Sequence, residues 1–326
     1  MNDVNSSSSL AQRAVAKQPE RVWVLGSDGS DCAHHAALWA VRHAPGRADT
    51  VRVAAAWNIP AAPSLAPMGS SVPSWDVRTM EAAAAASADA AAVRVRSELE
   101  LSPDPVDPKD AILVETDVRE GPTSSVLINA AHEAELLILG SRGLGGFSRL
   151  VLGSTSSQCA THASVPTAIV PLKVAVRTTQ RLVVAFDGSD NSMTALRWAI
   201  GFANSDAVLD CVTVWDVTPI VVGADQFFFP EANDLARERF NHLVDQVVDE
   251  MATEQPDVDQ PRIERHFVEG RPRIKLSQSA DSADLLVMGA RGHGAIGSAI
   301  LGSVSTWLLH QGNFPMVIVP HPVDDG

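Results

Sequence analysis

One stretch of the chain occurs twice, as ELLILGSRG at Glu135–Gly143 and as DLLVMGARG at Asp284–Gly292. Each copy is a short apolar run that ends in glycine, which is typical of a strand buried on both faces of a parallel sheet. Both copies continue at the same spacing to a Gly-Ser pair, at Gly153-Ser154 and at Gly302-Ser303. The repeat predicts two similar domains of the α/β class.

A second repeated stretch lies earlier in each copy, as VLGSDGSD at Val24–Asp31 and VVAFDGSD at Val183–Asp190. The two copies of this second stretch are separated by about ten more residues than the two copies of the first stretch. The first copy therefore contains about ten additional residues, which we place in the Pro-, Ala-, Ser- and Gly-rich segment Pro60–Pro73. From these registers we predict a disordered tail at 1–20, a first domain at 21–172, a linker at 173–180 and a second domain at 181–322.

Apolar runs and helical patterns alternate along each copy. In the first copy we expect strands near 21–26, 51–56, 111–115, 135–139 and 167–170, and helices near 31–43, 76–101, 122–132 and 154–162. This alternation predicts right-handed crossovers and a doubly wound, five-stranded parallel sheet in each of two tandem domains. Ligands of such sheets bind beyond the carboxyl ends of the strands. Asp28 and the loop that starts at Gly140 are expected to lie there.

The composition argues against several classes of protein. The chain has 326 residues and a formal net charge of −14. This charge disfavours broad electrostatic binding to nucleic acids or to an anionic membrane surface. The three cysteines are far apart in the sequence, which argues against a disulfide scaffold or a structural zinc site. The chain shows no apolar run of transmembrane length and no apolar core of a signal peptide, so we expect a cytoplasmic protein.

The glycines define a candidate phosphate-binding loop in each copy, with the spacing Gly-x2-Gly-x9-Gly-Ser from Gly140 to Ser154 and from Gly289 to Ser303. Glycines let backbone N–H groups approach an anion closely, and the first turn of a helix offers further N–H donors. A plain glycine-rich connection is the alternative for a single loop, but two loops with the same spacing argue against it. Asp28 and its counterpart can accept from a ribose hydroxyl or hold a magnesium ion through water.

At these residues the sequence resembles the universal stress protein family in its tandem two-domain form. The resemblance covers about Arg21 to Pro320, and both loops match the Gly-x2-Gly-x9-Gly-[Ser/Thr] motif of the family's ATP-binding subgroup. It implies an adenine nucleotide alpha-hydrolase-like fold with strand order 3-2-1-4-5. It also implies ATP, with magnesium, in each half, and a homodimer or a tandem pseudo-dimer joined through the fifth, edge strand.

The resemblance assigns residues to each site by position. The first site would comprise Gly26, Asp28, Ala56, Leu139, Gly140, Gly143, Arg149, Gly153, Ser154 and Thr155. The second would comprise Ala185, Asp187, Val214, Met288, Gly289, Gly292, Gly302, Ser303 and Val304. The adenine would meet the backbone at Ala56 and Val214. The sites differ at the pairs Gly26/Ala185, Thr155/Val304 and Arg149/Ser298, so we expect their affinities to differ.

Three functions remain open from the sequence. The first is an ATP-binding regulatory or stress-response module, in which the nucleotide biases conformational or partner states. The second is a slow ATPase or nucleotidyl-transfer enzyme that uses the same crevice. The third is a scaffold that acts through its edge-strand surfaces without nucleotide. Because no Walker lysine, catalytic base or arginine finger can be assigned, we expect a binding protein rather than an enzyme.

Overall fold

The computed structural model describes residues 20–59, 76–101, 111–144, 152–215, 220–222, 225–227, 230–256, 258–292, 301–311 and 313–321. The segment 60–73, in which we place the additional residues of the first copy, lies outside these ranges. Nearly all of the predicted tail at 1–20 also lies outside them.

The first half alternates strands and helices as predicted. Its strands are β1 (Val22–Gly26), β2 (Thr50–Trp57), β3 (Leu113–Glu120), β4 (Leu136–Gly140) and β5 (Thr167–Val170). Its helices are α1 (Asp31–His43), α2 (Val77–Glu100), α3 (Thr123–Ala130) and α4 (Ser154–His162). The predicted helices at 31–43 and 154–162 are confirmed, whereas the predicted third strand at 111–115 ends too early. The second part of β3 is polar and largely exposed, so it contains no continuous apolar run that would mark it as a strand.

The second half repeats this order. Its main strands are β6 (Arg181–Ala185), β7 (Val208–Trp215), β10 (Arg262–Glu269), β11 (Leu285–Gly289) and β12 (Met316–Val319). Its helices are α5 (Asp190–Phe202), α6 (Pro230–Glu254), α7 (Pro272–Ala280) and α8 (Ser303–Gln311). Two further short strands, β8 (Ile220–Val222) and β9 (Asp225–Phe227), pair with each other between β7 and α6.

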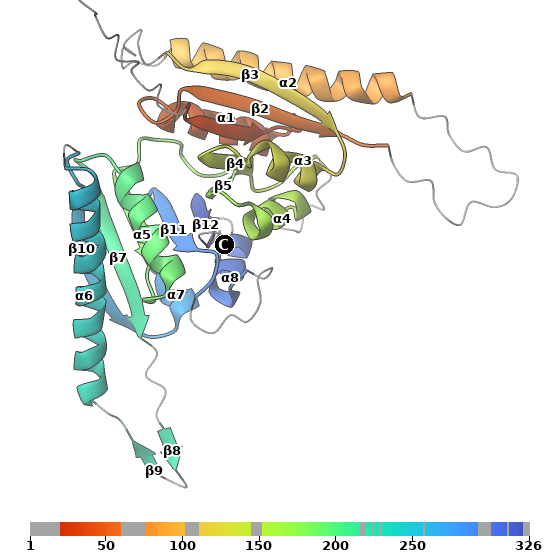
Figure 1. Cartoon of the computed structure of the whole chain (residues 1–326). Coiled ribbons are helices and arrows are strands. Elements are labelled where there is room, and N and C mark those ends of the chain that lie inside the picture. The colour runs from red at the N-terminus through yellow and green to blue at the C-terminus, as the bar shows by residue number, and fades with distance from the viewer. Residues whose placement is uncertain are drawn as a thin grey trace, which may run out of the picture.

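The main strands of both halves form one ten-stranded sheet in the order β10-β7-β6-β11-β12-β5-β4-β1-β2-β3. Within each half, neighbouring strands are parallel and follow the 3-2-1-4-5 order that the family resemblance implies. Between the halves, β5 and β12 pair in antiparallel fashion, with Ile169 opposite Met316. Figure 1 shows this junction near the middle of the molecule, with β3 and β10 on either side.

The prediction of one five-stranded sheet in each domain is therefore corrected to a single ten-stranded sheet, whereas the joining of the halves through the fifth strand, which the resemblance implies, is confirmed. Each fifth strand has four consecutive buried residues, and each would otherwise present unpaired N–H and C=O groups at a sheet edge. The antiparallel pair satisfies both edges at once and makes the sheet continuous. The two halves thus form a pseudo-dimer within one chain. A homodimer through edge strands stays a prediction.

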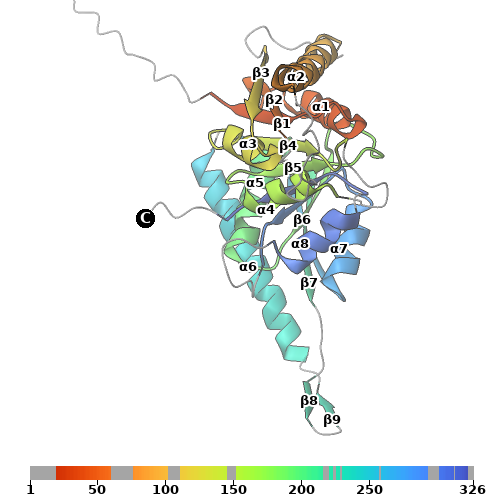
Figure 2. The same cartoon turned by 90° about the vertical axis from the view of Figure 1, so that its right-hand side faces the viewer.

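The helices cover the sheet in two layers, each with its own hydrophobic core. One core contains side chains of α1, α2, α5 and α6, including Trp39, Leu196 and Val244. The other contains side chains of α3, α4, α7 and α8, including Leu127 and Leu308. Both cores include residues of both halves, so the junction is packed on both faces of the sheet. Figure 2 shows α3, α4, α7 and α8 together on the side that faces the viewer.

An aromatic cluster joins α1 to the end of α5. The rings of Trp39 and Phe202 lie 6.0 Å apart and almost parallel, and Trp23 and Trp198 stack on the same phenyl ring. Arg47, which follows α1, lies over the ring of Phe202 at 4.9 Å and donates to its carbonyl oxygen at 3.0 Å. Trp39 of the first half and Trp198 of the second therefore pack at the boundary between the halves.

The segment predicted as a linker is anchored along α1. The Nε2 atom of His35 lies 2.6 Å from the carbonyl oxygen of Val174, to which it donates. His43 donates from Nδ1 to the carbonyl of Trp39, so its Nε2 accepts from the Thr179 hydroxyl at 2.8 Å. The linker thus belongs to the interface between the halves.

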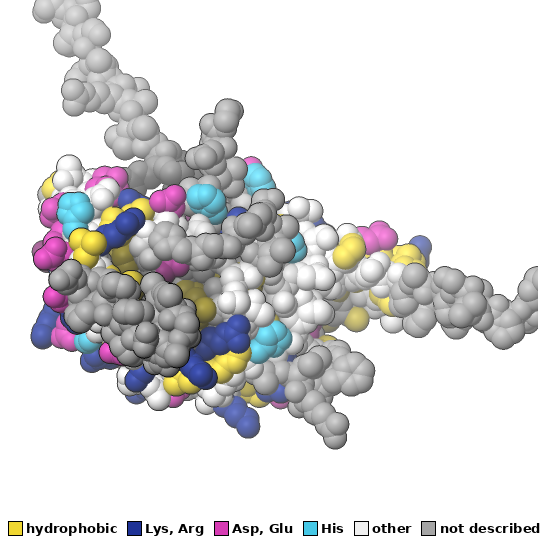
Figure 3. All heavy atoms as spheres, turned by 90° about the horizontal axis from the view of Figure 1, so that it is seen from below, with side chains coloured by type: hydrophobic (Ala, Val, Ile, Leu, Met, Phe, Trp, Pro, Cys, Tyr) yellow, Lys and Arg dark blue, Asp and Glu magenta, His cyan; other side chains and the backbone are white. Residues whose placement is uncertain are grey.

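The described helices include none that is both long and apolar enough to span a lipid bilayer. On the face seen in Figure 3, acidic and basic side chains are interspersed.

Candidate functional site

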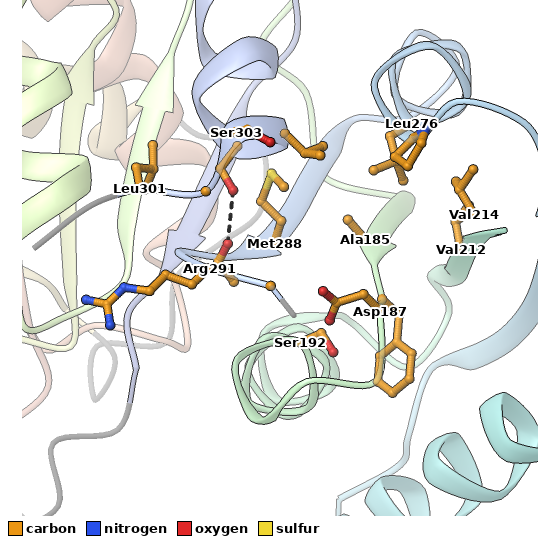
Figure 4. Close-up of a pocket in the computed structure, with 17 residues that line it drawn as sticks. Ala185, Asp187, Ser192, Val212, Val214, Leu276, Met288, Arg291, Leu301 and Ser303 are labelled. Carbon is orange, nitrogen blue, oxygen red and sulfur yellow. Dashed lines mark hydrogen bonds between the residues drawn. The ribbon is translucent and has the colours of Figure 1, made fainter. Parts of the chain in front are cut away.

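Each half contains a cavity at the carboxyl end of its central strands. The first has a volume of about 480 Å³ and the second about 500 Å³, within the usual range for small-molecule sites. In each case the walls are the ends of the first, second and fourth strands and the starts of the third and fourth helices. In Figure 4, Val212, Val214 and Leu276 gather on one side of Ala185, and Met288 and Ser303 on the other.

Two glycines in each loop are required by packing inside the protein. A Cβ atom at Gly140 would lie 2.6 Å from the backbone carbon of Cys32, and one at Gly289 would lie 2.8 Å from the Cβ of Asn191. A Cβ atom at Gly143 would overlap Oδ2 of Asp28, and the second half repeats this with Asp187. The loops therefore fit closely against the starts of α1 and α5.

The presence of one aspartate opposite the glycine loop in each half has a structural explanation. Oδ1 of Asp28 accepts from the N–H of Ser30 at 3.0 Å, and Oδ2 accepts from the N–H of Leu144 at 2.8 Å. Asp187 likewise accepts from the N–H of Ser189 at 3.0 Å. Asp28 therefore holds both the turn before α1 and the glycine loop, a role that the sequence pattern alone does not reveal.

The start of the fourth helix closes onto the end of the fourth strand. The N–H of Gly153 donates to the carbonyl of Ser141 at 2.8 Å, and the Ser156 hydroxyl donates to the carbonyl of Gly140 at 2.7 Å. In the second half, Gly302 and Ser305 make the matching bonds at 2.8 and 3.3 Å. These bonds place the first turns of α4 and α8 in the cavity wall.

Gly153 is the N-cap of α4, but no side chain caps this helix. Its backbone is extended, with φ −75° and ψ 153°, and a Cβ atom there would meet nothing nearer than 3.5 Å. Gly302 is equally uncrowded. By contrast, α1 is capped by the Ser30 side chain and α5 by that of Ser189. The fold therefore does not require glycine at Gly153, and the first N–H groups of α4 are left open at the cavity.

The backbone at the end of β2 also faces the cavity. The carbonyl of Trp57 accepts from the N–H of Gly121, on the β3 side, so the N–H and C=O of Ala56 point the opposite way, toward β1. The pairing of β1 with β2 ends at Gly26, with one further bond from Ser27 to Ala54. Among the described residues, Ala56 therefore has no backbone partner on that side.

Val214 is the counterpart of Ala56 in the second half. The carbonyl of Trp215 accepts from the N–H of Gly270, and the last bond between β6 and β7 runs from Phe186 to Val212. Val214 thus directs its N–H and C=O into the second cavity in the same way.

A protein-family model of the universal stress protein family matches residues 21–171 and again 178–320. The chain belongs to the universal stress protein family. A universal stress protein of Mycobacterium tuberculosis is 28% identical over 329 residues, which cover 95% of this chain and 98% of that protein. Another from the same organism is 30% identical over 198 residues, or 59% of this chain and 64% of that protein, so this match spans less than two thirds of the relative.

The fold is that of solved universal stress proteins. The crystal structure of one from Archaeoglobus fulgidus has a TM-score of 0.62 and 19% identity, and the match covers 93% of this chain and 99% of that chain. At this level of identity the similarity concerns the fold alone.

Nearly all residues that the family motif assigns to the two sites line the cavities. In the first half these are Gly26, Asp28, Ala56, Leu139, Gly140, Gly143, Gly153, Ser154 and Thr155. In the second half they are Ala185, Asp187, Val214, Met288, Gly289, Gly292, Gly302, Ser303 and Val304. Arg149 lies outside the described residues. The structure thus brings the assigned residues together, while their binding of a ligand stays a prediction.

The cavities also contain residues that the motif did not indicate. Thr123 and Leu127 of α3 line the first, and Pro272 and Leu276 of α7 line the second, together with Arg142 or Arg291 from the loops. In Figure 4, the side chain of Arg291 extends away from Asp187. The register of the Glu135–Gly143 repeat aligns α3 with α7, so comparison of the two copies is the signal that could have found this wall.

The difference between Gly26 and Ala185 follows from internal packing. A Cβ atom at Gly26 would overlap Cδ2 of Leu139. In the second half the unbranched side chain of Met288 replaces this leucine and leaves room for the methyl group of Ala185. This pair of differences does not require a different ligand.

Asp210, Glu264 and His266 form a group of potential metal ligands in the described part of the chain. Asp210 is buried, and Arg181 approaches it with Nε at 2.5 Å from Oδ2. His266 lies 2.8 Å from the other carboxylate oxygen. Because the guanidinium already pairs with the carboxylate, we interpret this group as a structural ion pair on β6, β7 and β10.

Proposed function

We propose that each half binds one adenine nucleotide together with magnesium, and that the protein acts as a nucleotide-dependent regulatory module in the response to stress. The base would lie at the end of β2 or β7, and the phosphates at the start of α4 or α8. Asp28 and Asp187 would accept from a ribose hydroxyl or hold a hydrated magnesium ion.

The uncapped start of α4 is the observation that carries this proposal. A helix N-terminus with free N–H groups is a favourable site for phosphate. Gly153 is demanded neither by the backbone conformation nor by internal contacts, and its lack of a side chain keeps the loop open to a ligand. The same glycine, with the same free space, occurs at Gly302.

The free backbone N–H and C=O groups suit the base, at Ala56 in the first cavity and at Val214 in the second. Adenine presents a ring nitrogen that accepts and an adjacent amino group that donates. One residue with an outward N–H and C=O can pair with both. The apolar side chains of Leu127 and Leu276 line the same end of the cavities and can cover the faces of the ring.

Binding fits the described residues better than catalysis. Asp28 and Asp187 are the carboxylates among the described lining residues, and each accepts backbone N–H groups that hold its own turn. A bound nucleotide can instead act by its differential affinity for two states of the protein. The loops contact α1 and α5, and these two helices meet at the aromatic cluster. Packed side chains therefore connect a ligand bound at a loop with the junction of the halves.

The proposal is tested with Gly153→Asp and Gly302→Asp, singly and together. Aspartate is a good N-cap residue, so it should preserve or strengthen the helix while its charge repels phosphate from the same N–H groups. We expect the unaltered chain to bind ATP with magnesium in isothermal titration calorimetry. The double variant should bind at least about a hundredfold more weakly, with an unchanged or higher melting temperature.

Gly201→Asp is the matched control, because it adds the same charge at an exposed position of α5 away from both cavities. It should bind ATP as the unaltered chain does. The absence of any adenine nucleotide bound at millimolar ATP, or unchanged binding by the double variant, would overturn the proposal.

A further inference from the structure

The two cavities differ by one hydroxyl in the first turn of the helix that follows β1 or β6. Ser192 of α5 lines the second cavity, and Ala33 of α1 occupies the matching position in the first. Both residues lie five positions beyond the aspartate of their half, Asp28 or Asp187. Ser192 is 3% exposed, so the fold buries a polar side chain in the wall of the second cavity and a methyl group in that of the first.

The hydrogen bonds of Ser192 leave its side-chain oxygen as an acceptor. Its hydroxyl donates to the carbonyl oxygen of Ser189 at 2.8 Å, and its N–H donates to the Ser189 hydroxyl at 3.3 Å. Because the single hydroxyl proton is used in this way, lone pairs of the oxygen remain for a donor in the cavity. A ligand group that pairs with Ser192 must therefore be a donor.

Ser189 also connects Ser192 with Asp187. The N–H and the hydroxyl of Ser189 donate to Oδ1 of Asp187 at 3.0 and 2.5 Å. In Figure 4, the side chains of Asp187 and Ser192 both lie between Val214 on one side and Ser303 on the other. The proposed site has the base at the first of these residues and the phosphates at the second. Ser192 then faces the sugar that joins them.

A ribose offers the donors that this position requires. Its 2′ and 3′ hydroxyl groups each carry one proton, and a deoxyribose lacks one of these groups. In the second half, the Asp187 carboxylate and the Ser192 hydroxyl can both accept from the sugar. In the first half, Ala33 offers no polar side-chain atom that could accept together with Asp28.

The hydroxyl of Ser27, in the first cavity, does not replace that of Ser192. Its counterpart Phe186 directs its ring toward Phe240 of α6, with 5.7 Å between the ring centres. Because Ser27 has the same register after β1, its side chain lies on the face covered by α1 and α2. Its oxygen accepts from the N–H of Gly29 at 3.4 Å. The other hydroxyl groups that only the first cavity has, among the described lining residues, belong to the opposite layer of helices, at Thr123 and Thr155.

We propose that Ser192 makes the second site select ribonucleotides over deoxyribonucleotides, and that the first site lacks this additional selectivity. Loss of one ribose hydroxyl removes the donor to Ser192 and leaves its buried oxygen without that partner, which is unfavourable. A site built to pair with a hydroxyl rejects an analogue that lacks it. This inference rests on the proposed nucleotide sites.

The two sites are measured separately in blocked variants. Gly302→Asp leaves only the first site open, and Gly153→Asp leaves only the second. Dissociation constants for ATP, 2′-deoxy-ATP and 3′-deoxy-ATP, each with magnesium, are determined by calorimetry in both backgrounds. For at least one deoxynucleotide, we expect the ratio of its dissociation constant to that of ATP to be at least about fivefold higher at the second site than at the first.

Exchange of the two residues identifies the cause. Ser192→Ala should lower the deoxynucleotide-to-ATP ratio at the second site to that of the first, and Ala33→Ser should raise it at the first. Each variant has the residue that the other half carries at this position, so both should remain folded, which circular dichroism and the melting temperature check. Thr194→Val is the matched control, because it removes a hydroxyl from the same helix outside the described lining of the cavity. It should leave the ratio unchanged.

Equal ratios at the two sites for both deoxynucleotides, or a ratio at the second site that Ser192→Ala leaves unchanged, would overturn the inference while nucleotide binding itself stands. The latter result includes equal weakening of all three nucleotides, in which case Ser192 accepts from a group that they share, such as magnesium-bound water. Failure of the proposed function looks different, because none of the nucleotides would then bind in either blocked variant.

Discussion

His43 is a buried histidine with a hydrogen bond on each ring nitrogen. It is 2% exposed, and burial is the main reason why its pKa lies near 4 rather than at the usual 6.5. The positive charges of Arg47 and Arg42 lower the pKa further, whereas the carbonyl of Trp39 and the charge of Asp284 raise it. The neutral ring is therefore the form that packs between α1 and the segment containing Thr179.

This histidine should make the protein less stable in mild acid. Between pH 6.5 and 4 the unfolded chain binds a proton at this position and the folded chain does not, so the free energy of unfolding falls as the pH falls. The shift corresponds to about 3 kcal/mol over this window. Urea unfolding of His43→Gln from pH 7 to 4.5 should show a shallower loss of stability than the unaltered chain. His34→Gln, on the same helix, should keep the full loss. Identical pH slopes for the His43 variant and the unaltered chain would contradict the assignment.

The helix α1 connects three features of the molecule. Its start contacts the glycine loop through Ser30, whose hydroxyl donates to the carbonyl of Arg142 at 3.4 Å. Its middle and end hold the segment that links the halves through His35 and His43. Just beyond its end, Arg47 contacts the second half. The helix thus contributes both to the wall of the first site and to the contacts across the junction.

Arg47→Ala should weaken this junction. The guanidinium donates to the carbonyls of Phe202 and His43 and to the side chain of Asn204. Bonds from a charged group are worth about 1.5–3 kcal/mol, so we expect the free energy of unfolding to fall by about 2–3 kcal/mol. Arg42→Ala is the control, because Arg42 is exposed and its removal should change stability by less than about 0.5 kcal/mol. Equal effects in the two variants, measured by urea unfolding, would show that Arg47 does not support the junction.

The molecule as a whole is one sheet with two cores, and each core contains residues of both halves. The sequence repeat indicates two domains, yet β5 and β12 have no exposed edge at which the halves could separate without loss of pairing. We therefore expect the halves to unfold together.

Val317→Ala tests this cooperativity. Val317 is fully buried in β12, opposite Ala168, and its truncation should cost about 2 kcal/mol. If the halves unfold together, the slowest-exchanging amides of β1, in the other half, should exchange roughly thirtyfold faster in native-state hydrogen exchange. Unchanged exchange in β1, with faster exchange confined to β6, β11 and β12, would instead show that the halves unfold separately.

The sequence by itself determined the features that depend on local spacing. The paired repeats, the alternation of strands and helices, and the placement of the glycine loops at helix starts follow from periodicity within a few turns of chain. Family membership follows from the same residues. Even so, β3 was misplaced, because an exposed edge strand has no strong apolar pattern.

Only the tertiary structure decided how distant segments meet. It fixed the antiparallel register of β5 against β12, with Ile169 opposite Met316, because two buried strands with open edges gain by pairing. It gave Asp28 the N–H of Leu144 as a partner and brought Thr123 and Ala56 into the wall of one cavity. It also distinguished two kinds of loop glycine. Internal contacts require glycine at Gly140 and Gly143, but they do not require it at Gly153. Such distinctions depend on what each residue contacts across the fold, and spacing along the chain does not contain that information.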